Sequence, residues 1–185
     1  MSRHLEKYFR APAAVFRRFC AARGGTTAVE FAMIAPAFFA LLFAILQLTS
    51  YLFAQQALQT AAISAGRLIL TGQVQAANLT QSQFKTNDVC PLLPSFFTCG
   101  NLYVNVTSYT NFSSASTATP SLSISSSGTI STTGSYSLGG PGTVMVLQLV
   151  YPWSIISGPF GSILPNYSNN YTELMGISAF RVEPY

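Results

Sequence analysis

The sequence predicts an α+β protein, in which a long N-terminal transmembrane and stalk helix is followed by a small antiparallel β-sheet domain. Two observations predict the helix. Residues 31–66 contain no charged side chain, and apolar residues recur at helical spacing beyond residue 54. A third observation predicts the sheet, because alternating apolar and polar residues appear from residue 101 onward. The 185 residues suffice for one modest domain plus an anchor.

A basic leader occupies residues 1–25. It contains six Arg or Lys residues and one Glu, a net charge of +5, whereas the rest of the chain has three basic and four acidic residues. The basic pI therefore describes the leader and not a nucleic-acid-binding surface, so we expect no nucleic-acid partner. We expect this leader to be cytoplasmic and to be cleaved from the mature protein.

The apolar run from Phe31 to Ala54 is 24 residues long. About 20 apolar residues span a bilayer as a helix. Because the basic residues precede the run, we expect the N-terminus to stay cytoplasmic and the C-terminal domain to be exported. A secretory signal peptide is the alternative, but its apolar core usually has about 7–15 residues. A retained single-pass anchor fits the run better.

One helix is expected from Thr26 to about Leu70, with a stalk beyond the membrane, in a segment that we bound at residues 26–72. Pro36 lies inside it and removes a backbone donor, which predicts a kink. Gly72 is placed to end the helix. The expected apolar stripe of the stalk is Ala54, Leu58, Ala61, Ala65 and Leu68, with Gln55, Gln56, Gln59, Thr60 and Arg67 on other faces.

Residues 73–185 are expected to form the exported β-rich domain. Its strand candidates begin at Asn101, Thr143 and Leu174. Between the first two, residues 113–142 include 21 Ser, Thr or Gly among 30 positions. Within this segment SLSISSSGTIS, residues 121–131, alternates weakly and predicts an irregular hairpin, with a flexible loop as the alternative.

Of the three cysteines, Cys20 lies in the leader, while Cys90 and Cys99 lie in the exported part. Two nearby cysteines in an oxidising compartment usually pair, which predicts a disulfide between Cys90 and Cys99. Metal binding is the alternative, but no His and few acids lie near them.

Residues 89–172 contain no Asp, Glu, Lys or Arg, and the single His is His4 in the leader. The exported domain therefore has no imidazole base for a nucleophile and no His-based metal site, and we expect no catalytic residue, metal or cofactor. Asp88, Glu173 and Glu183 could form a carboxylate pair, although scattered acids are more often solvated surface. Trp153 and the tyrosines could line a sugar-binding face, although such aromatics are more often core.

Glu30 is a carboxylate at the start of the apolar run, where a charge is costly and usually functional. A simple interpretation is that it complements the helix dipole. The pattern around it is more specific. A basic leader, Gly25, Thr26 and then Glu30 at position five resembles the processing site of type IV pilins. GGTTAVEFAMIAPAF, with Pro36 six residues after Glu30, resembles the TadE-like minor pilins, or pseudopilins, of the tight adherence (Tad) pilus.

Further pieces fit the same family, namely AAISAGRLILTGQ in the stalk, LQLVYPW, and the closing SAFRVEPY. The resemblance covers the first 70 residues well and the rest only in scattered pieces. It implies cleavage after Gly25 by a prepilin peptidase; cleavage after Gly24 would instead put Glu30 at position six. It also implies that Glu30 neutralises the new amine of Thr26 on a neighbouring subunit.

The family's implied partners are the inner membrane, the prepilin peptidase, other major and minor pilin subunits and the pilus membrane platform. The implied location is the bacterial inner membrane, with a periplasmic C-terminal domain, and incorporation into the surface pilus is left open. Because more than 110 residues follow the stalk, the principal filament subunit is not expected. The alternatives are a membrane-anchored periplasmic module that binds a ligand or surface polymer, and an envelope enzyme.

Overall fold

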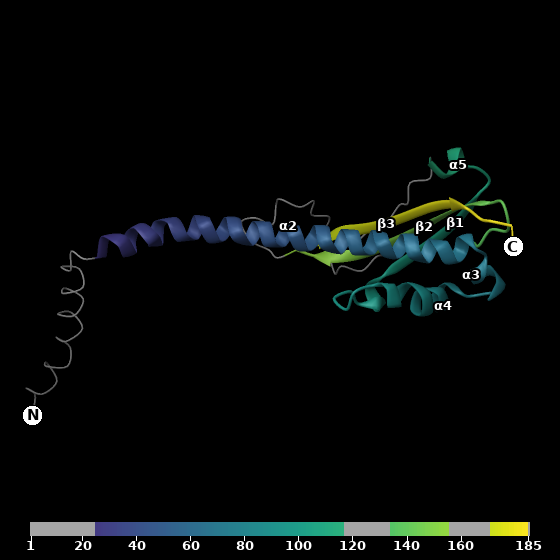
Figure 1. Cartoon of the computed structure of the whole chain (residues 1–185), viewed down its shortest axis with the longest axis horizontal. Helices are drawn as coiled ribbons and strands as arrows, with labels where there is room; N and C mark the ends of the chain where they lie inside the picture. The colour runs from purple at the N-terminus through teal and green to yellow at the C-terminus, as the bar shows by residue number, and fades with distance from the viewer. Residues whose placement is uncertain (1–24, 117–133, 156–170, 185) are drawn as a thin grey trace, which may run out of the picture. The chain divides into compact units, whose positions relative to one another are not determined.

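The computed structural model describes residues 25–116, 134–155 and 171–184 of the chain. The chain divides into two compact units, residues 1–44 and residues 45–185. The described helices and strands are α2 (Thr26–Leu70), α3 (Gln73–Ala76), α4 (Gln81–Gln83), β1 (Tyr103–Tyr109), α5 (Phe112–Ser116), β2 (Val144–Ser154) and β3 (Tyr171–Arg181), and Figure 1 labels them. A long helix and a three-stranded antiparallel sheet confirm the predicted α+β class.

The helix α2 begins and ends where the sequence predicts. It has 45 residues and continues through Pro36, so at about 1.5 Å per residue it is about 68 Å long. Gly72 ends it in the left-handed conformation, with φ of 75°, and its N–H donates to the Ile69 carbonyl (3.1 Å). Glycine adopts this conformation without the steric cost that a Cβ would bring.

The C-terminal half of α2 packs on one face of the sheet. Its buried residues are Ala54, Leu58, Ala61, Ala62, Ala65, Gly66 and Ile69. This stripe matches the predicted one except at its end, where Ile69 is fully buried and Leu68 only half-buried. The stripe consists mostly of small residues, which lets the helix backbone come close to the strands.

The sheet has the order β1-β2-β3, with both pairs antiparallel. The register places Val106 opposite Leu147, and Leu147 opposite Ser178. The central strand β2 is buried along most of its length, as its near-continuous apolar sequence predicts. Because β1 pairs only as far as Val150, Pro152 lies where β2 has one free edge, and a strand tolerates proline there.

The two edges of the predicted exported domain differ from expectation. Residues 73–101 were expected to have strand periodicity, but the structure places α3, α4, a π-helical segment (Phe84–Val89) and two short 3₁₀ turns there. Local side-chain bonds explain part of this, since Thr80 and Gln83 form a capping box at α4. The last strand also begins at Tyr171, three residues before the predicted Leu174.

The predicted hairpin at residues 121–131 lies outside the described residues. On its flanks, Phe112–Ser116 is helical and Tyr136 forms an isolated parallel bridge with Val106 of β1. The Val106 N–H donates to the Ser135 carbonyl (2.8 Å), and the Ser137 N–H donates to the Val106 carbonyl (2.9 Å). The end of the Ser/Thr/Gly-rich segment therefore covers part of the outer edge of β1.

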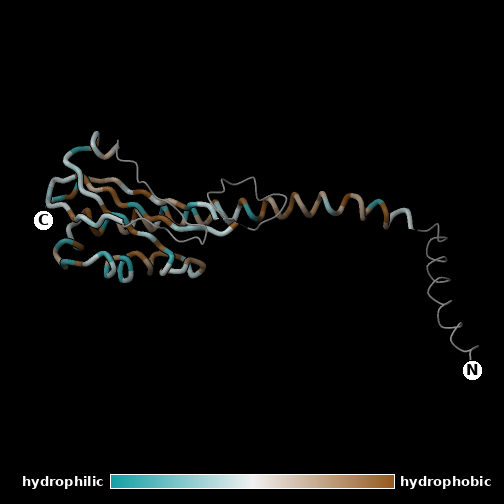
Figure 2. The backbone as a smooth tube through the Cα atoms, turned by 180° about the vertical axis from the view of Figure 1, so that it is seen from behind, coloured by the Kyte–Doolittle hydropathy of each residue, from teal (hydrophilic) through white to brown (hydrophobic). Residues whose placement is uncertain are grey.

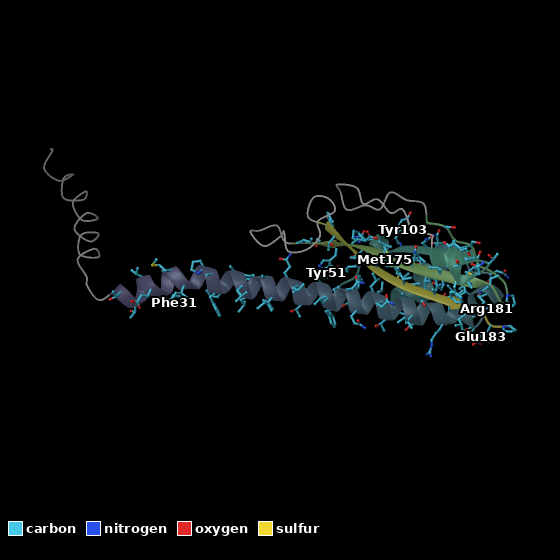
Figure 3. The ribbon with its side chains drawn as sticks, turned by 90° about the horizontal axis from the view of Figure 1, so that it is seen from above. Phe31, Tyr51, Tyr103, Met175, Arg181 and Glu183 are labelled. Atoms are coloured by element: carbon cyan, nitrogen blue, oxygen red, sulfur yellow. A yellow bond between two sulfur atoms is a disulfide. The ribbon has the colours of Figure 1, made fainter. Side chains whose placement is uncertain are left out.

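The outer edge of β3 is closed by two glutamines of α2. Gln55 Nε2 donates to the Met175 carbonyl (2.7 Å), and the Met175 N–H donates to Gln55 Oε1 (3.3 Å). Gln59 repeats this pattern at Ile177, with distances of 2.8 and 3.0 Å. Four residues of helix rise about 6 Å and two residues of strand about 6.8 Å, so the two spacings match. Figure 3 shows Met175 among the side chains of this region.

Replacing Gln55 and Gln59 together by Leu is expected to lower the free energy of unfolding by about 2 kcal/mol, because net hydrogen bonds contribute about 0.5–1.5 kcal/mol each and β3 loses its edge partners. Urea denaturation of the full chain in detergent, followed by Trp153 fluorescence, measures this change. Gln56→Leu is the matched control, since Gln56 is exposed and lies between the pair. Equal midpoints for the double variant and the control would contradict the edge-closing role.

Cys90 and Cys99 form a disulfide that closes the loop before β1, with Cα atoms 5.7 Å apart. Phe97 within the loop is buried and stacks edge-on against Tyr151 of β2, with ring centroids 4.8 Å apart. The Tyr151 hydroxyl accepts from the Thr98 N–H (3.2 Å). The loop is therefore pinned to the sheet by one aromatic side chain and one hydrogen bond.

Replacing Cys90 and Cys99 by Ser is expected to lower the free energy of unfolding by about 2–3 kcal/mol, because the unfolded chain regains the freedom of a closed ring of this size. Denaturation midpoints of the oxidised protein and of the variant give the difference. Cys20→Ser, which alters a cysteine outside the pair, should leave the midpoint unchanged. The disulfide would have no stabilising role if reductant and the double substitution both left the midpoint where it was.

Candidate functional site

The junction between the leader and α2 is open. Gly25 is exposed, and a Cβ built on it would meet nothing within 4 Å. Its φ is not in the left-handed region, so neither packing nor backbone conformation in this chain demands glycine there. Thr26, the next residue, is the first residue of α2 and is also exposed. A glycine without a structural reason at an accessible junction suits recognition by another molecule.

Glu30 lies one helical turn beyond Thr26 on the same face of α2, because the two residues are four apart. It is exposed and lies outside the first turn of the helix, which contains no acidic residue. The dipole effect falls off within that turn, so it gives Glu30 little stabilisation. Within α2 the next charged residue is Arg67, so the helix itself offers Glu30 no nearby cation.

The first part of α2 presents an apolar surface. Large exposed side chains surround the helix, and they include Phe31, Met33, Ile34, Phe38, Phe39, Leu41, Leu42, Phe43, Ile45 and Leu46. Figure 2 draws this part of the helix largely in the brown of hydrophobic residues. A helix that is apolar on all sides is a membrane span or a buried core helix. Among the described residues, α2 is long and apolar enough to cross a bilayer.

A row of small residues follows the same helix at four-residue spacing, at Ala28, Ala32, Ala40 and Ala44, with Pro36 in the middle of the row. Small residues at this spacing let helix backbones approach closely in membranes. The spacing is visible in the sequence, but its meaning depends on the helix being continuous from Thr26, which the structure shows.

Two hydroxyl groups near the end of the apolar run are satisfied within the helix. Thr49 Oγ1 donates to the Ile45 carbonyl (2.8 Å), and Ser50 Oγ donates to the Gln47 carbonyl (2.9 Å). A hydroxyl bonded to its own helix avoids the cost of an unpaired polar group in lipid. These residues are therefore compatible with a span that extends to about Ser50.

The three acids that could have formed a carboxylate pair lie on separate elements. Asp88 belongs to the π-helical segment, Glu173 to β3, and Glu183 follows β3. Burial raises the pKa of Glu173, and both burial and the nearby Asp88 raise the pKa of Tyr136 to about 12. In the part of the chain that the structure describes, no three His, Cys, Asp or Glu side chains gather in a way that could hold a metal ion.

Trp153 is part of the core boundary and does not stand on an open face. It is half-buried, and its ring lies 6.2 Å from Phe96 and 6.3 Å from Phe97, measured between centroids. This arrangement favours the packing interpretation of the aromatic residues over a flat sugar-binding surface. The residues that the sequence patterns did not single out for packing, Gln55, Gln59 and Gly176, all lie where α2 meets β3.

Comparisons with known proteins give one match. The family model described as TadE-like protein matches residues 25–67, which run from the open junction at Gly25 almost to the end of α2. Searches of curated proteins and of solved structures gave no match. The junction, Glu30, Pro36 and the apolar surface all fall inside the matched segment. The N-terminal segment of this chain is TadE-like, consistent with a TadE-like protein of the Tad pilus.

Proposed function

We propose that this protein is a minor pilin, or pseudopilin, needed for assembly of a Tad-type adhesive pilus. The observation that carries the proposal is that the TadE-like match begins at Gly25 and covers the helix that follows it. In this proposal a prepilin peptidase removes residues 1–25 on the cytoplasmic side of the bacterial inner membrane. The mature chain then starts at Thr26, the first residue of the helix.

Cleavage at this point creates an ammonium group at Thr26 beside a lipid-facing helix. An unpaired charge in lipid is costly, and pairing it with an opposite charge offsets the cost. Glu30 is the only carboxylate in the helix, and no cation of the same helix lies near it. It is therefore the group that would neutralise the Thr26 amine of a neighbouring subunit when helices pack together.

The apolar surface of α2 has two successive roles in this proposal. Before assembly it holds the protein in the inner membrane, with the N-terminus cytoplasmic and the sheet domain in the periplasm. During assembly it packs against the helices of other major and minor pilin subunits, and the alanine row allows close approach. The pilus membrane platform is the implied site of this transfer.

The sheet domain adds a surface to the filament machinery and not a catalyst. Its acids lie on separate elements, and its sequence between residues 89 and 172 has no charged side chain that could act as a base. A chain with so large a domain beyond the helix suits a rare or priming subunit better than the principal subunit of the filament.

Deletion of the gene tests the proposal. We expect the deletion strain to lose surface filaments in electron micrographs and in sheared fractions, and the full-length gene to restore them. Intact filaments in the deletion strain would contradict the proposal. If such a strain instead failed to bind a ligand or surface polymer, the protein would be a membrane-anchored binding module.

A further inference from the structure

Five aromatic side chains form a continuous cluster, which we call the aromatic rim. It consists of Phe53 of α2, Phe96 and Phe97 of the disulfide loop, and Tyr151 and Trp153 of β2. Phe96 links the three elements, because its ring centroid lies 5.8 Å from that of Phe53, 4.8 Å from Phe97 and 6.2 Å from Trp153. The cluster is therefore one packed unit and not a set of isolated side chains.

The aromatic rim lies at one end of the sheet. Trp153 pairs in register with Thr172, at the beginning of β3, while the other end of the sheet is marked by Tyr109, Val144 and Arg181. Nine residues of β2 separate Val144 from Trp153, which corresponds to about 30 Å. Phe53 precedes Gln55, the first glutamine bonded to β3, so the rim is at the end where α2 first meets the sheet.

The rim is open on its outer side. Phe53 is 62% exposed and Phe96 is 43% exposed. Leu52 beside Phe53 and Leu92 in the disulfide loop are exposed as well. Behind them Phe97 and Tyr151 are buried and Trp153 is half-buried. A soluble domain gains nothing from exposing two phenylalanines that already pack together, so this surface suits a partly apolar neighbour.

The position of the rim along α2 indicates which neighbour it has. A span of about 20 residues that begins after Glu30 ends near Ser50, and its last hydroxyls are bonded within the helix. Phe53 is three residues farther, or about 4.5 Å along the axis. That distance falls within the headgroup layer, where aromatic side chains, Trp and Tyr above all, are enriched in membrane proteins.

We propose that the aromatic rim sits in the headgroup layer of the leaflet from which the sheet domain emerges, so that the lipid surface is a docking surface for the domain. The proposal rests on the membrane anchoring included in the proposed function, and it adds a second contact that fixes the domain against the bilayer before assembly. Charge supports it, because residues 89–172 contain no charged side chain that would resist entry into the layer. Extraction into a filament would then have to detach the rim as well as the helix.

Trp153 is the only tryptophan in the chain, so its fluorescence reports on the rim alone. The full chain is placed in nanodiscs made with lipids brominated either near the headgroup end or near the terminal methyl of the acyl chain. We expect strong loss of Trp153 emission with the shallow bromines, weaker loss with the deep ones, and little loss with aqueous iodide. Quenching by iodide without quenching by either lipid would overturn the proposal.

A Phe53→Ser, Phe96→Ser double variant tests whether the rim makes the contact. Both side chains are exposed, so the fold should remain, and shallow quenching of Trp153 should fall. Phe112→Ser is the matched control, because Phe112 is 54% exposed but lies on α5, after the end of β1 that is opposite the rim. Figure 1 shows α5 at the end of the sheet where β3 finishes. An equal fall in both variants would contradict the proposal.

A second probe separates this proposal from membrane anchoring. In a Trp153→Phe background, Phe39→Trp places a tryptophan in the apolar part of α2. Deep quenching of that probe together with an unquenched Trp153 would overturn the docking of the rim and leave the anchor intact. If neither probe is quenched, the anchor fails too. Neither result depends on the counting of filaments, so loss of the pilus role is recognised independently.

Discussion

Replacing Glu30 by Gln is expected to abolish incorporation of the protein into pili and to reduce piliation to the level of the deletion strain. The substitution keeps the size of the side chain and removes its charge, which leaves the Thr26 amine of a neighbouring subunit unpaired in an apolar environment. Loss of one partner of a buried ion pair costs about 3–5 kcal/mol, which is enough to exclude a subunit from an assembly. Immunoblots of sheared filaments measure incorporation, and blots of membranes measure the protein that remains.

Glu183→Gln is the control for this substitution, because Glu183 is an exposed acid beyond β3. It should leave incorporation unchanged. If Glu30 only complemented the helix dipole, its removal would cost a few tenths of a kcal/mol, since it lies outside the first turn. Normal incorporation of the Glu30→Gln protein would therefore favour the dipole interpretation and contradict the charge pair.

Replacing Gly176 by Ala is expected to lower the free energy of unfolding of the sheet domain by about 1–3 kcal/mol. A Cβ at this position would lie 2.7 Å from the Leu58 carbonyl oxygen and 3.1 Å from the Ala62 Cβ. The first contact is with helix backbone, so the helix would have to move away from β3. That movement would also lengthen the hydrogen bonds of Gln55 and Gln59 to the strand. Urea denaturation of the full chain in detergent measures the loss.

Gly100→Ala is the matched glycine control. A Cβ at Gly100 would meet nothing within 4 Å, and its φ is not positive. Its substitution should change stability by no more than about 0.5 kcal/mol. If the two alanine variants unfold at the same urea concentration, the close approach of α2 to β3 is not a determinant of stability.

The long helix could be predicted from the sequence because its signals are local. A basic leader ends in glycines, an uncharged run follows, and Gly72 supplies the left-handed residue that ends the helix. The strands were predictable for a similar reason, since alternating residues in β1 and a continuous apolar run in β2 reflect burial on one face and on two. Leu68 was assigned to the stripe in place of Ile69 because four-residue steps drift around a helix with 3.6 residues per turn.

Other features depend on contacts between distant residues. Gln55 and Gln59 were assigned to faces away from the apolar stripe, although their amides pair with β3 backbone about 120 residues later. Nothing in their local sequence indicates that partner. Residues 73–101 carry few periodic apolar positions, and their short helical turns are set by the capping box and by the packing of Phe84 and Val89. Pairing with β2 likewise extends β3 back to Tyr171.

The candidate site was predicted as a spacing, and its chemistry needs a second molecule. Gly25, Thr26 and Glu30 were identified by their order, and the structure adds that all three are exposed and that Thr26 and Glu30 share a helix face. The cleavage of the leader and the pairing of Glu30 with a neighbour remain predictions, because each requires a peptidase or another subunit.

The most direct test of the account is the mass of the mature N-terminus, measured on protein purified from membranes of cells with an active prepilin peptidase. The account predicts that the mature chain begins at Thr26 and that a Gly25→Ala variant keeps the leader. Because Gly25 makes no contact that a Cβ would disturb, the variant should fold and insert normally. An intact leader on the unsubstituted protein would contradict the account and leave a signal-anchored sheet domain without a role as a pilin.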